Sequence, residues 1–283
     1  SIILTGQHRE MVVPLMAYFG LSADYNLDIM AQGQSLAHIS SEVIKRLDPA
    51  LAALRPDLVF VQGDTSSAFV AALTAFYHRI PVAHIEAGLR THHKYSPFPE
   101  EINRRLVSPI ADYHFAPTEH AKENLFKEGI RKNVFVVGNT SLDAALWAIE
   151  RNPESPFIGD KNFILVTAHR RENWGRPLEQ ICEALLELVA KYRDLSVLFP
   201  VHPNPVVKDL VYKKLGNNLN IHLCEPLDYS KMVWAMKNCL MILTDSGGLQ
   251  EEGPLFKKPV LVLRESTERP EGVSAGSSLL VGT

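Results

Sequence analysis

The sequence contains little cysteine, little excess charge and no long hydrophobic run, and each shortage excludes a class of protein. Its three cysteines in 283 residues, Cys182, Cys224 and Cys239, show neither CxxC spacing nor a paired framework, so we expect free thiols in the cytoplasm. The net charge of −3 provides no general surface for nucleic acid or for an acidic membrane. No apolar segment reaches the length of a membrane span. We therefore expect a globular protein that binds neither nucleic acid nor membrane.

A dinucleotide-binding G-x-G-x-x-G motif is also missing, although strand-like runs alternate with helical patterns along the whole chain. The runs are continuous in Val, Ile and Phe rather than alternating, which indicates parallel strands that helices bury on both faces. We expect strands at 2–5, 58–61, 81–85, 113–115, 134–137, 163–167, 196–201, 221–223, 240–244 and 260–263. We expect helices at 35–54, 67–77, 119–128, 141–151, 178–192, 205–215 and 229–237. This order of elements predicts an α/β fold.

A change of composition at 152–156, where two prolines follow a helical pattern, indicates a link between two domains. We therefore expect Rossmann-like domains over 1–154 and 155–283, facing each other across a ligand-binding cleft. The chain opens inside one strand-like run, 1–6, and stops just after another, 278–283. We expect the natural protein to continue at both ends.

The stretch 243–252 has the pattern of a phosphate-binding turn between a strand and a helix. Ser246 can offer a hydroxyl, while Gly247 and Gly248 let the backbone amides of the new helix approach an anion closely. Glu252 lies about one turn into that helix, where a carboxylate suits a sugar diol. A plain helix cap by the Asp or Ser of the turn explains the same residues without a ligand.

Carboxylates stand at the ends of two neighbouring expected strands. Asp64 follows the strand 58–61 and can cap the next helix. Glu86 ends the strand 81–85, where a carboxylate costs free energy unless it is paired or protonated. These two side chains are candidates for a site at the carboxyl edge of the sheet.

A third group of charged residues follows in 99–105. Glu100 can pair with Arg104, and Glu101 with Arg105, across one helical turn. Exposed pairs of this kind contribute only about 0.3–0.5 kcal/mol each. Their position after strand ends that already carry carboxylates favours a site instead.

In the second domain, basic residues follow the expected strand 163–167. His169, Arg170, Arg171 and Arg176 lie within eight residues, which favours phosphate binding because guanidinium groups bind phosphate in a bidentate way. A solvated basic loop explains the same cluster without a ligand. His202, after the strand 196–201, either contacts a ligand or orders a turn.

Five ordered motifs together resemble one family, the non-hydrolysing UDP-N-acetylglucosamine (UDP-GlcNAc) 2-epimerases, which have the two-domain glycosyltransferase-B architecture. The motifs are residues 84–90, 99–101 with Arg104, 167–172, 244–252 and 267–271. The resemblance covers essentially the whole chain. It implies reversible conversion of UDP-GlcNAc to UDP-N-acetylmannosamine (UDP-ManNAc), by anti elimination of UDP to 2-acetamidoglucal and re-addition, in the synthesis of surface polysaccharides.

The resemblance also implies roles for particular residues, with no metal and no nicotinamide cofactor. Residues on the sugar side are Asp64, Glu86, Glu100 and Arg104, with His169 near the diphosphate. Residues that bind UDP are Arg170, Ser246, Gly247, Gly248 and Glu252. Which carboxylate removes the C2 proton and which returns it stays open.

The family further implies a homodimer and, in some members, a second UDP-GlcNAc that activates the enzyme, for which Gln7 and His8 are candidates. An ordinary polar loop explains those two residues equally well. The family's opening strand with its Gly-Thr-Arg-Pro-Glu-like loop, and its closing helix, are not in this sequence. If the natural protein lacks them, we expect little or no epimerase activity, and a UDP-sugar sensor then fits the motifs better. A hydrolysing epimerase, which releases free ManNAc and UDP, and a retaining glycosyltransferase on the same architecture would also fit them.

Overall fold

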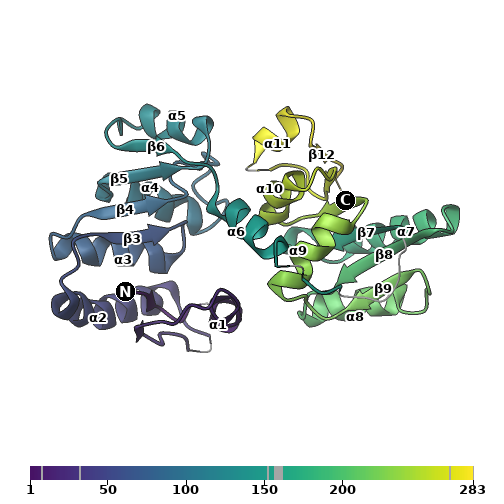
Figure 1. Ribbon diagram of the computed structural model, residues 1–283, viewed down its shortest axis with the longest axis horizontal. Coiled ribbons are helices and arrows are strands. Elements are labelled where there is room, and N and C mark those ends of the chain that lie inside the picture. Colours follow the sequence, from purple (N-terminus) through teal and green to yellow (C-terminus); the bar gives the residue numbers. More distant parts are fainter. Residues whose placement is uncertain (8, 32, 152, 156–161, 268, 283) are drawn as a thin grey trace. The chain divides into compact units, whose positions relative to one another are not determined.

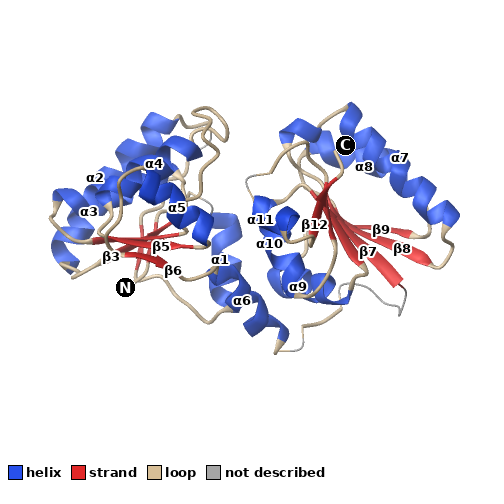
Figure 2. Ribbon diagram, turned by 90° about the horizontal axis from the view of Figure 1, so that it is seen from above, coloured by secondary structure: helices blue, strands red, loops and turns tan. Residues whose placement is uncertain are grey.

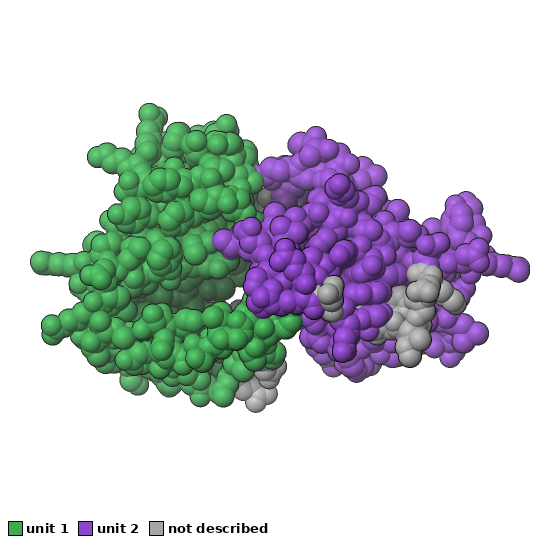
Figure 3. Space-filling model, in the orientation of Figure 1, with its two compact units in different colours: residues 1–139 green, residues 140–283 purple. Residues whose placement is uncertain are grey.

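The computed structural model describes residues 1–7, 9–31, 33–151, 153–155, 162–267 and 269–282. The chain divides into two compact units, Ser1–Asn139 and Thr140–Thr283, which Figure 3 colours separately. Each unit consists of parallel strands joined by helices, as Figure 1 shows. The α/β class expected from the sequence is confirmed. None of the described helices is both long and apolar enough to cross a membrane.

Unit 1 carries two parallel sheets, β1-β2 and β3-β4-β5-β6. Its elements are β1 (Ile3–Leu4), α1 (Arg9–Tyr18), β2 (Tyr25–Asn26), α2 (Leu36–Leu54), β3 (Val59–Gln62), α3 (Ser66–Tyr77), β4 (Val82–Ile85), α4 (Glu100–Ile110), β5 (Tyr113–Ala116), α5 (Glu119–Lys127) and β6 (Val134–Val136). The helices α2, α3 and α4 lie on one face of the four-stranded sheet (Figure 2), where apolar side chains of α2 and α3 pack against β3 and β4.

The other face of the four-stranded sheet carries stacked aromatic rings. The ring centroids of Phe60 and Phe115 lie 6.3 Å apart, and those of Phe115 and Phe135 lie 5.8 Å apart. Phe60 is 59% exposed and Phe135 is 46% exposed. The expectation that helices bury these strands on both faces is therefore wrong for this sheet. The strands are continuously apolar because their aromatic side chains contact one another across the sheet.

Unit 2 contains one six-stranded parallel sheet in the order β12-β11-β10-β7-β8-β9. Its elements are α6 (Thr140–Ile149), β7 (Asn162–Thr167), the 3₁₀ turn η1 (Arg171–Asn173), α7 (Arg176–Lys191), β8 (Leu195–Pro200), α8 (Pro205–Leu215), β9 (Ile221–Cys224), α9 (Tyr229–Asn238), β10 (Met241–Thr244), α10 (Gly247–Leu255), β11 (Val260–Val262), α11 (Pro270–Ser274) and β12 (Ser278–Leu280). The chain leaves β7 toward β8 on one side and returns to β10 on the other. The loops after β7 and β10 therefore flank the switch point, where such sheets bind ligands.

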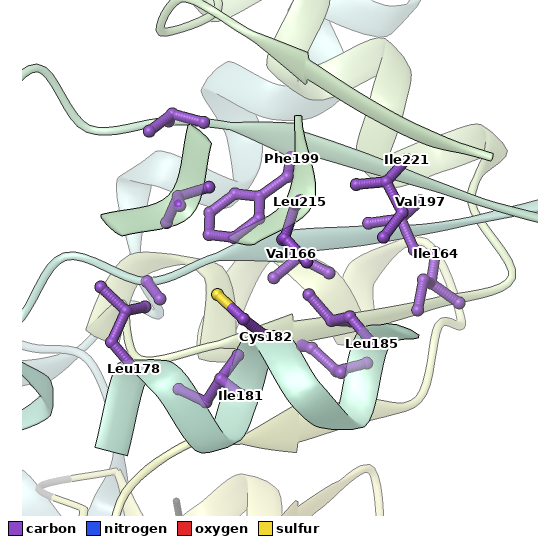
Figure 4. Packing of buried hydrophobic residues seen from close by; sticks show 14 of the residues in the cluster. Ile164, Val166, Leu178, Ile181, Cys182, Leu185, Val197, Phe199, Leu215 and Ile221 are labelled. Atoms are coloured by element: carbon purple, nitrogen blue, oxygen red, sulfur yellow. The ribbon is translucent and has the colours of Figure 1, made fainter. Parts of the chain in front are cut away.

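The core of unit 2 lies between the sheet and the helices α7 and α8 (Figure 4). Leu178, Cys182 and Leu185 project from one side of α7 and contact Val166 and Phe199 of the sheet. Cys182 is fully buried, and burial raises the pKa of its thiol to about 11. This thiol therefore packs as an apolar side chain.

The division between the units falls at Asn139 and Thr140, earlier than the expected domain boundary at 154/155. The helix α6 packs against α9 and α10, and its Ala145 and Ala148 are fully buried. These contacts place α6 with the second unit. The prolines at 153 and 156 come after α6 in the sequence, so they indicate where a helix of unit 2 ends. The division between the two units lies before that helix.

Candidate active site

Two carboxylates lie at the same edge of the sheet in unit 1. The strands β3 and β4 are parallel neighbours, with Gln62 opposite Ile85, so their carboxyl ends coincide. Asp64 follows β3 and Glu86 follows β4 directly. The expectation that both candidates occupy one edge is confirmed by this register.

Arg104 joins the two carboxylates. It lies one turn into α4 and only 6% of the residue is exposed. Its Nη2 pairs with Asp64 Oδ2 and lies 3.1 Å from Glu86 Oε2, while Nη1 donates to the main-chain oxygen of Glu86. A guanidinium group stays charged when buried, so Arg104 can pair with both carboxylates at once. Their side chains keep 27% and 21% exposure and can reach a ligand.

Backbone geometry turns Glu86 toward this arginine. Its φ of 67° is left-handed, which is uncommon for a residue with a side chain. Gly88 two residues later packs so closely on α5 that a Cβ would lie 2.1 Å from the Ala121 oxygen. Asn124 of α5 donates to the Gly88 oxygen at 3.1 Å. The turn after β4 is therefore fixed by contact with α5.

The acidic pair of α4 does not form the helical salt bridges that were the alternative to a site. Glu101 accepts from the amides of Thr91 and His92 at 2.9 and 3.2 Å, and it is 3% exposed. Arg105 lies 3.5 Å from Glu128 instead of pairing with Glu101. The hypothesis of i,i+4 pairs is thus wrong, because both arginines have acidic partners in other elements. Glu100 is the half-buried first residue of α4.

His84 is a neutral side chain that connects β4 to the loop after β3 by a hydrogen bond. Its Nε2 lies 2.8 Å from the Gly63 oxygen, a group that only accepts, so Nε2 carries the proton. Burial, with a smaller effect from the charge of Arg104, lowers the pKa of His84 to about 3. Asn103 likewise donates to the main-chain oxygen of Asp64 at 2.9 Å. Thr65, not Asp64, caps α3, which leaves the Asp64 side chain for Arg104.

In unit 2, the loop after β7 meets the turn after β10. The strands pair with Thr167 opposite Thr244, and the hydroxyls of these two residues lie 2.6 Å apart. The amides of His169 and Arg170 donate to Asp245 Oδ2, each at 2.8 Å. The loop that carries the basic cluster therefore lies against the start of α10.

The turn 245–248 has the features of an anion site. Ser246 is the N-cap residue of α10, but its side chain makes no capping hydrogen bond. Its own amide donates to the Thr244 hydroxyl at 2.9 Å. The amides that follow, of Gly247 and Gly248, belong to the first turn of the helix, where anions bind. The hypothesis of a plain helix cap therefore fails for both Asp245 and Ser246.

Glu252 lies beside this helix N-terminus. A Cβ placed on Gly248 would be 4.0 Å from its Oε1. Burial, and then the charge of Glu251, raise the pKa of Glu252 to about 7, while a hydrogen bond from Ser141 opposes the shift. Glu251 itself pairs with Arg269 of the loop before α11. An acid that is protonated near neutral pH can both donate to and accept from a diol.

The remaining basic candidates are distributed over several elements. His169 is 38% exposed and its ring stacks on His202, with centroids 5.7 Å apart. Arg176 begins α7 instead of belonging to the loop. His202 accepts from the Asn204 amide at 3.2 Å, so it orders the turn as well. Among the described residues, no group of three or more His, Cys, Asp or Glu is arranged to hold a metal ion.

Near the N-terminus, Gln7 lines a small pocket with Thr5, Arg9 and Ser67, and its side-chain oxygen accepts from the Ser67 hydroxyl. His8 lies outside the described residues. The roles of His84, Asn103 and Asp245 were not predicted from the sequence. A polar residue inside or just after an apolar run was the available signal for His84 and Asp245.

Comparison with known proteins identifies the relatives of this chain. The profile of a family described as "UDP-N-acetylglucosamine 2-epimerase" matches residues 1–283. An Escherichia coli K12 protein of that name is 46% identical over 296 residues, which covers 100% of this chain and 79% of that protein. The structure of the Neisseria meningitidis UDP-GlcNAc 2-epimerase bound to UDP-GlcNAc is 47% identical with a TM-score of 0.90, covering 98% of this chain and 78% of that one. A putative UDP-N-acetylglucosamine 2-epimerase from Listeria monocytogenes is 45% identical with a TM-score of 0.94, covering 100% and 76%.

Proposed function

This chain belongs to the UDP-N-acetylglucosamine 2-epimerase family, and from that membership we infer that it interconverts UDP-GlcNAc and UDP-ManNAc by inverting C2 of the sugar. The observation that carries the assignment to particular residues is the arginine-linked carboxylate pair, Asp64 and Glu86 on Arg104. Inversion at C2 requires a base to remove one proton and an acid to supply another. Two partly exposed carboxylates at one edge provide both groups.

In this proposal the reaction proceeds in two balanced steps. A carboxylate of unit 1 takes the C2 proton while the bond between C1 and the UDP oxygen breaks, giving 2-acetamidoglucal, UDP and a protonated enzyme. UDP then returns to C1 while an acid protonates C2 on the opposite face. Asp64, Glu86 and Glu100 are the candidate proton carriers, and Arg104 fixes the first two.

The UDP is assigned to unit 2. The Ser246 hydroxyl and the amides of Gly247 and Gly248 lie at the start of α10, where an anion can bind, and Glu252 beside them suits the ribose diol. His169 and Arg170 lie on the loop that Asp245 holds against this turn, so we assign them to the diphosphate. Donors fixed before the reaction stabilise the charge that develops on the departing UDP.

Incubation in deuterated water tests the function. We expect deuterium at C2 of recovered UDP-GlcNAc, together with UDP-ManNAc and no accumulation of free ManNAc. Turnover without incorporation contradicts the proton-transfer roles, and stoichiometric release of ManNAc and UDP identifies a hydrolysing enzyme instead.

The division of labour between the units is tested by two substitutions. We expect Glu86→Gln to lower kcat about 100-fold or more with little change in UDP affinity, because it removes a proton carrier. We expect Glu252→Ala to weaken UDP binding about tenfold, the scale of one hydrogen-bonded polar contact. Isothermal titration with UDP and initial-rate kinetics separate the two effects. An unchanged UDP affinity in Glu252→Ala would remove the ribose assignment.

Three further features belong to the proposal. A second UDP-GlcNAc contacts Gln7 as an activator, so Gln7→Ala changes the shape of the substrate saturation curve and leaves UDP binding intact. The protein is a homodimer, which light scattering measures. It works in the cytoplasm in surface polysaccharide synthesis, a location that suits its three free thiols.

A further inference from the structure

Asp245 is fully buried, and its two oxygens have different partners. Oδ2 accepts from the amides of His169 and Arg170, each at 2.8 Å, and from Asn173 Nδ2 at 2.9 Å. Oδ1 is also buried and meets no aligned donor among the described residues, but His169 Nδ1 lies 3.1 Å away. A buried carboxylate is stable only when its charge is compensated, so one oxygen depends on the imidazole of His169.

The three hydrogen bonds of Oδ2 already hold the loop after β7, and Ser246 occupies the N-cap position of α10. Neither role involves Oδ1. Oδ1 instead affects the proton position on the imidazole of His169. A carboxylate oxygen only accepts, so it favours a proton on Nδ1, the ring nitrogen that faces it.

We propose that Asp245 is a positioning residue for His169: it keeps the proton on Nδ1, so that Nε2 on the far side of the ring is the atom presented to the diphosphate of the substrate. This inference rests on the proposed placement of His169 beside the diphosphate. No proton transfer by His169 is involved. Nε2 donates to the charge that develops on UDP only when it also carries a proton, and Nδ1 then still faces Asp245 Oδ1.

Other contacts fix the same ring. His202, after β8, stacks on it with an interplanar angle of 14°. Burial, and then the charge of His169, lower the pKa of His202, so its ring packs as a neutral plane. Trp174 donates to the main-chain oxygen of His169 at 3.2 Å. In the same loop, Glu172 pairs with Arg264 after β11 at 2.9 Å.

The wild-type protein provides the first test. Ring nitrogen chemical shifts from NMR spectroscopy report the tautomer, and the signals of His169 are identified by their loss in His169→Gln. We expect the neutral ring to carry its proton on Nδ1. A neutral ring protonated on Nε2 overturns the proposal, and this measurement requires no Asp245 variant to fold.

Asp245→Asn provides the second test. The amide must turn its oxygen toward the three donors that Oδ2 accepts, so its NH₂ group faces His169 Nδ1. We expect the neutral tautomer to switch to Nε2–H, and kcat to fall about 10–100-fold, as for other residues that orient a site side chain, with a smaller change in KM. An unchanged tautomer with unchanged kcat in a folded variant overturns the proposal.

Asp228→Asn is the matched control. Asp228 caps α9 by accepting from the Lys231 amide at 2.9 Å, and asparagine caps equally well. We expect the tautomer of His169 and kcat to stay at wild-type values. The two proposals fail separately. If Asp245→Asn switches the tautomer but the wild-type protein has no epimerase activity, the proposed function is wrong and the positioning role stands. If the wild-type protein is an active epimerase but its neutral His169 carries the proton on Nε2, the positioning role is wrong and the function stands.

Discussion

At the scale of single residues, Arg104 has the most demanding position in unit 1. It is buried, it contacts Asp64 and Glu86 together, and no other arginine or lysine among the described residues contacts either carboxylate through an ion pair. Lysine carries the same charge but lacks the planar fork that reaches two partners at once. The geometry of the pair therefore depends on the guanidinium group and not on charge alone.

We expect Arg104→Lys to lower kcat about 30–100-fold, the equivalent of one misplaced charged hydrogen bond, while the protein stays folded. Steady-state kinetics measure the loss, and circular dichroism checks the fold. The neighbouring Arg105→Lys is the control, because Arg105 is 52% exposed on its side chain and only approaches Glu128. Wild-type turnover in Arg104→Lys would show that the linked pair is not needed for the reaction.

Glu252 makes stability depend on pH. Its folded pKa of about 7 lies above the unfolded value of 4.5, so the folded state binds the extra proton between these values. Stability then falls as pH rises through this window, by at most about 3 kcal/mol and less to the extent that solvent screens the group. In urea unfolding at pH 5.5 and 8, we expect Glu252→Gln to lose part of that dependence.

The control for this titration is Glu187→Gln, which changes an exposed glutamate of α7 and keeps the wild-type dependence. If Glu252→Gln and wild type lose stability equally between pH 5.5 and 8, Glu252 is not the titrating group.

From the sequence, it was easier to predict which residues lie near one another than which side-chain contacts each of them makes. Asp64 and Glu86 lie together because parallel strand ends meet, which the sequence can indicate, whereas Arg104 reaches both from α4. For Glu101 the sequence offered only Arg105, one helical turn away, as a partner, because the amides of Thr91 and His92 that it binds cannot be recognised from neighbouring positions. Asp245 resembled a helix cap because its partners, 72 to 76 residues away, cannot be read from neighbouring positions.

At the scale of elements, the connection from β4 to α4 depends on one glycine. Gly88 has a φ of 88°, and a Cβ there would lie 2.1 Å from the Ala121 oxygen and 3.1 Å from Leu125 Cγ. Either the turn or α5 must move to admit a methyl group. Because this turn also sets the direction of Glu86, such a movement reaches the site.

We expect Gly88→Ala to lower the free energy of unfolding by more than about 3 kcal/mol, through overlap with α5 in addition to backbone strain. Gly129→Ala is the matched control, since Gly129 has a φ of 86° but open space where its Cβ would be. It should cost only about 1–2 kcal/mol from the backbone conformation. Denaturant unfolding measures both, and equal losses would show that the contact with α5 is unimportant.

Most strands and long helices were predicted from the sequence to within two residues, because their apolar runs end at turn-forming residues. The short β2, α1 and α11 were missed. The two residues of β2, Tyr25 and Asn26, form no apolar run, and α1 contains Pro14. The covering of unit 1 was also mispredicted. The apolar content of a strand indicates that it has apolar partners, and it does not say whether these are helices or aromatic rings of other strands in the same sheet.

At the scale of the whole molecule, the sheets and the buried cluster of each unit contain only residues of that unit. The contact boundary and the boundary expected from composition differ in the assignment of α6. Contacts of α6 with α9 and α10, and the hydrogen bond of Ser141 to Glu252, join it to unit 2. Prolines in the sequence indicate where a helix stops, whereas a domain boundary depends on where the helix packs.

Two fragments test which boundary holds. We expect residues 140–283 to unfold cooperatively by themselves, because the fragment keeps the six-stranded sheet and α6. Residues 155–283 lose the helix whose Ala145 and Ala148 are fully buried, so their unfolding free energy should be about 2–3 kcal/mol lower, the scale of one or two buried side chains. Urea midpoints of the two fragments measure the difference. Equal midpoints would return the boundary to 154/155, and α6 would then be a connection that contributes nothing to the stability of unit 2.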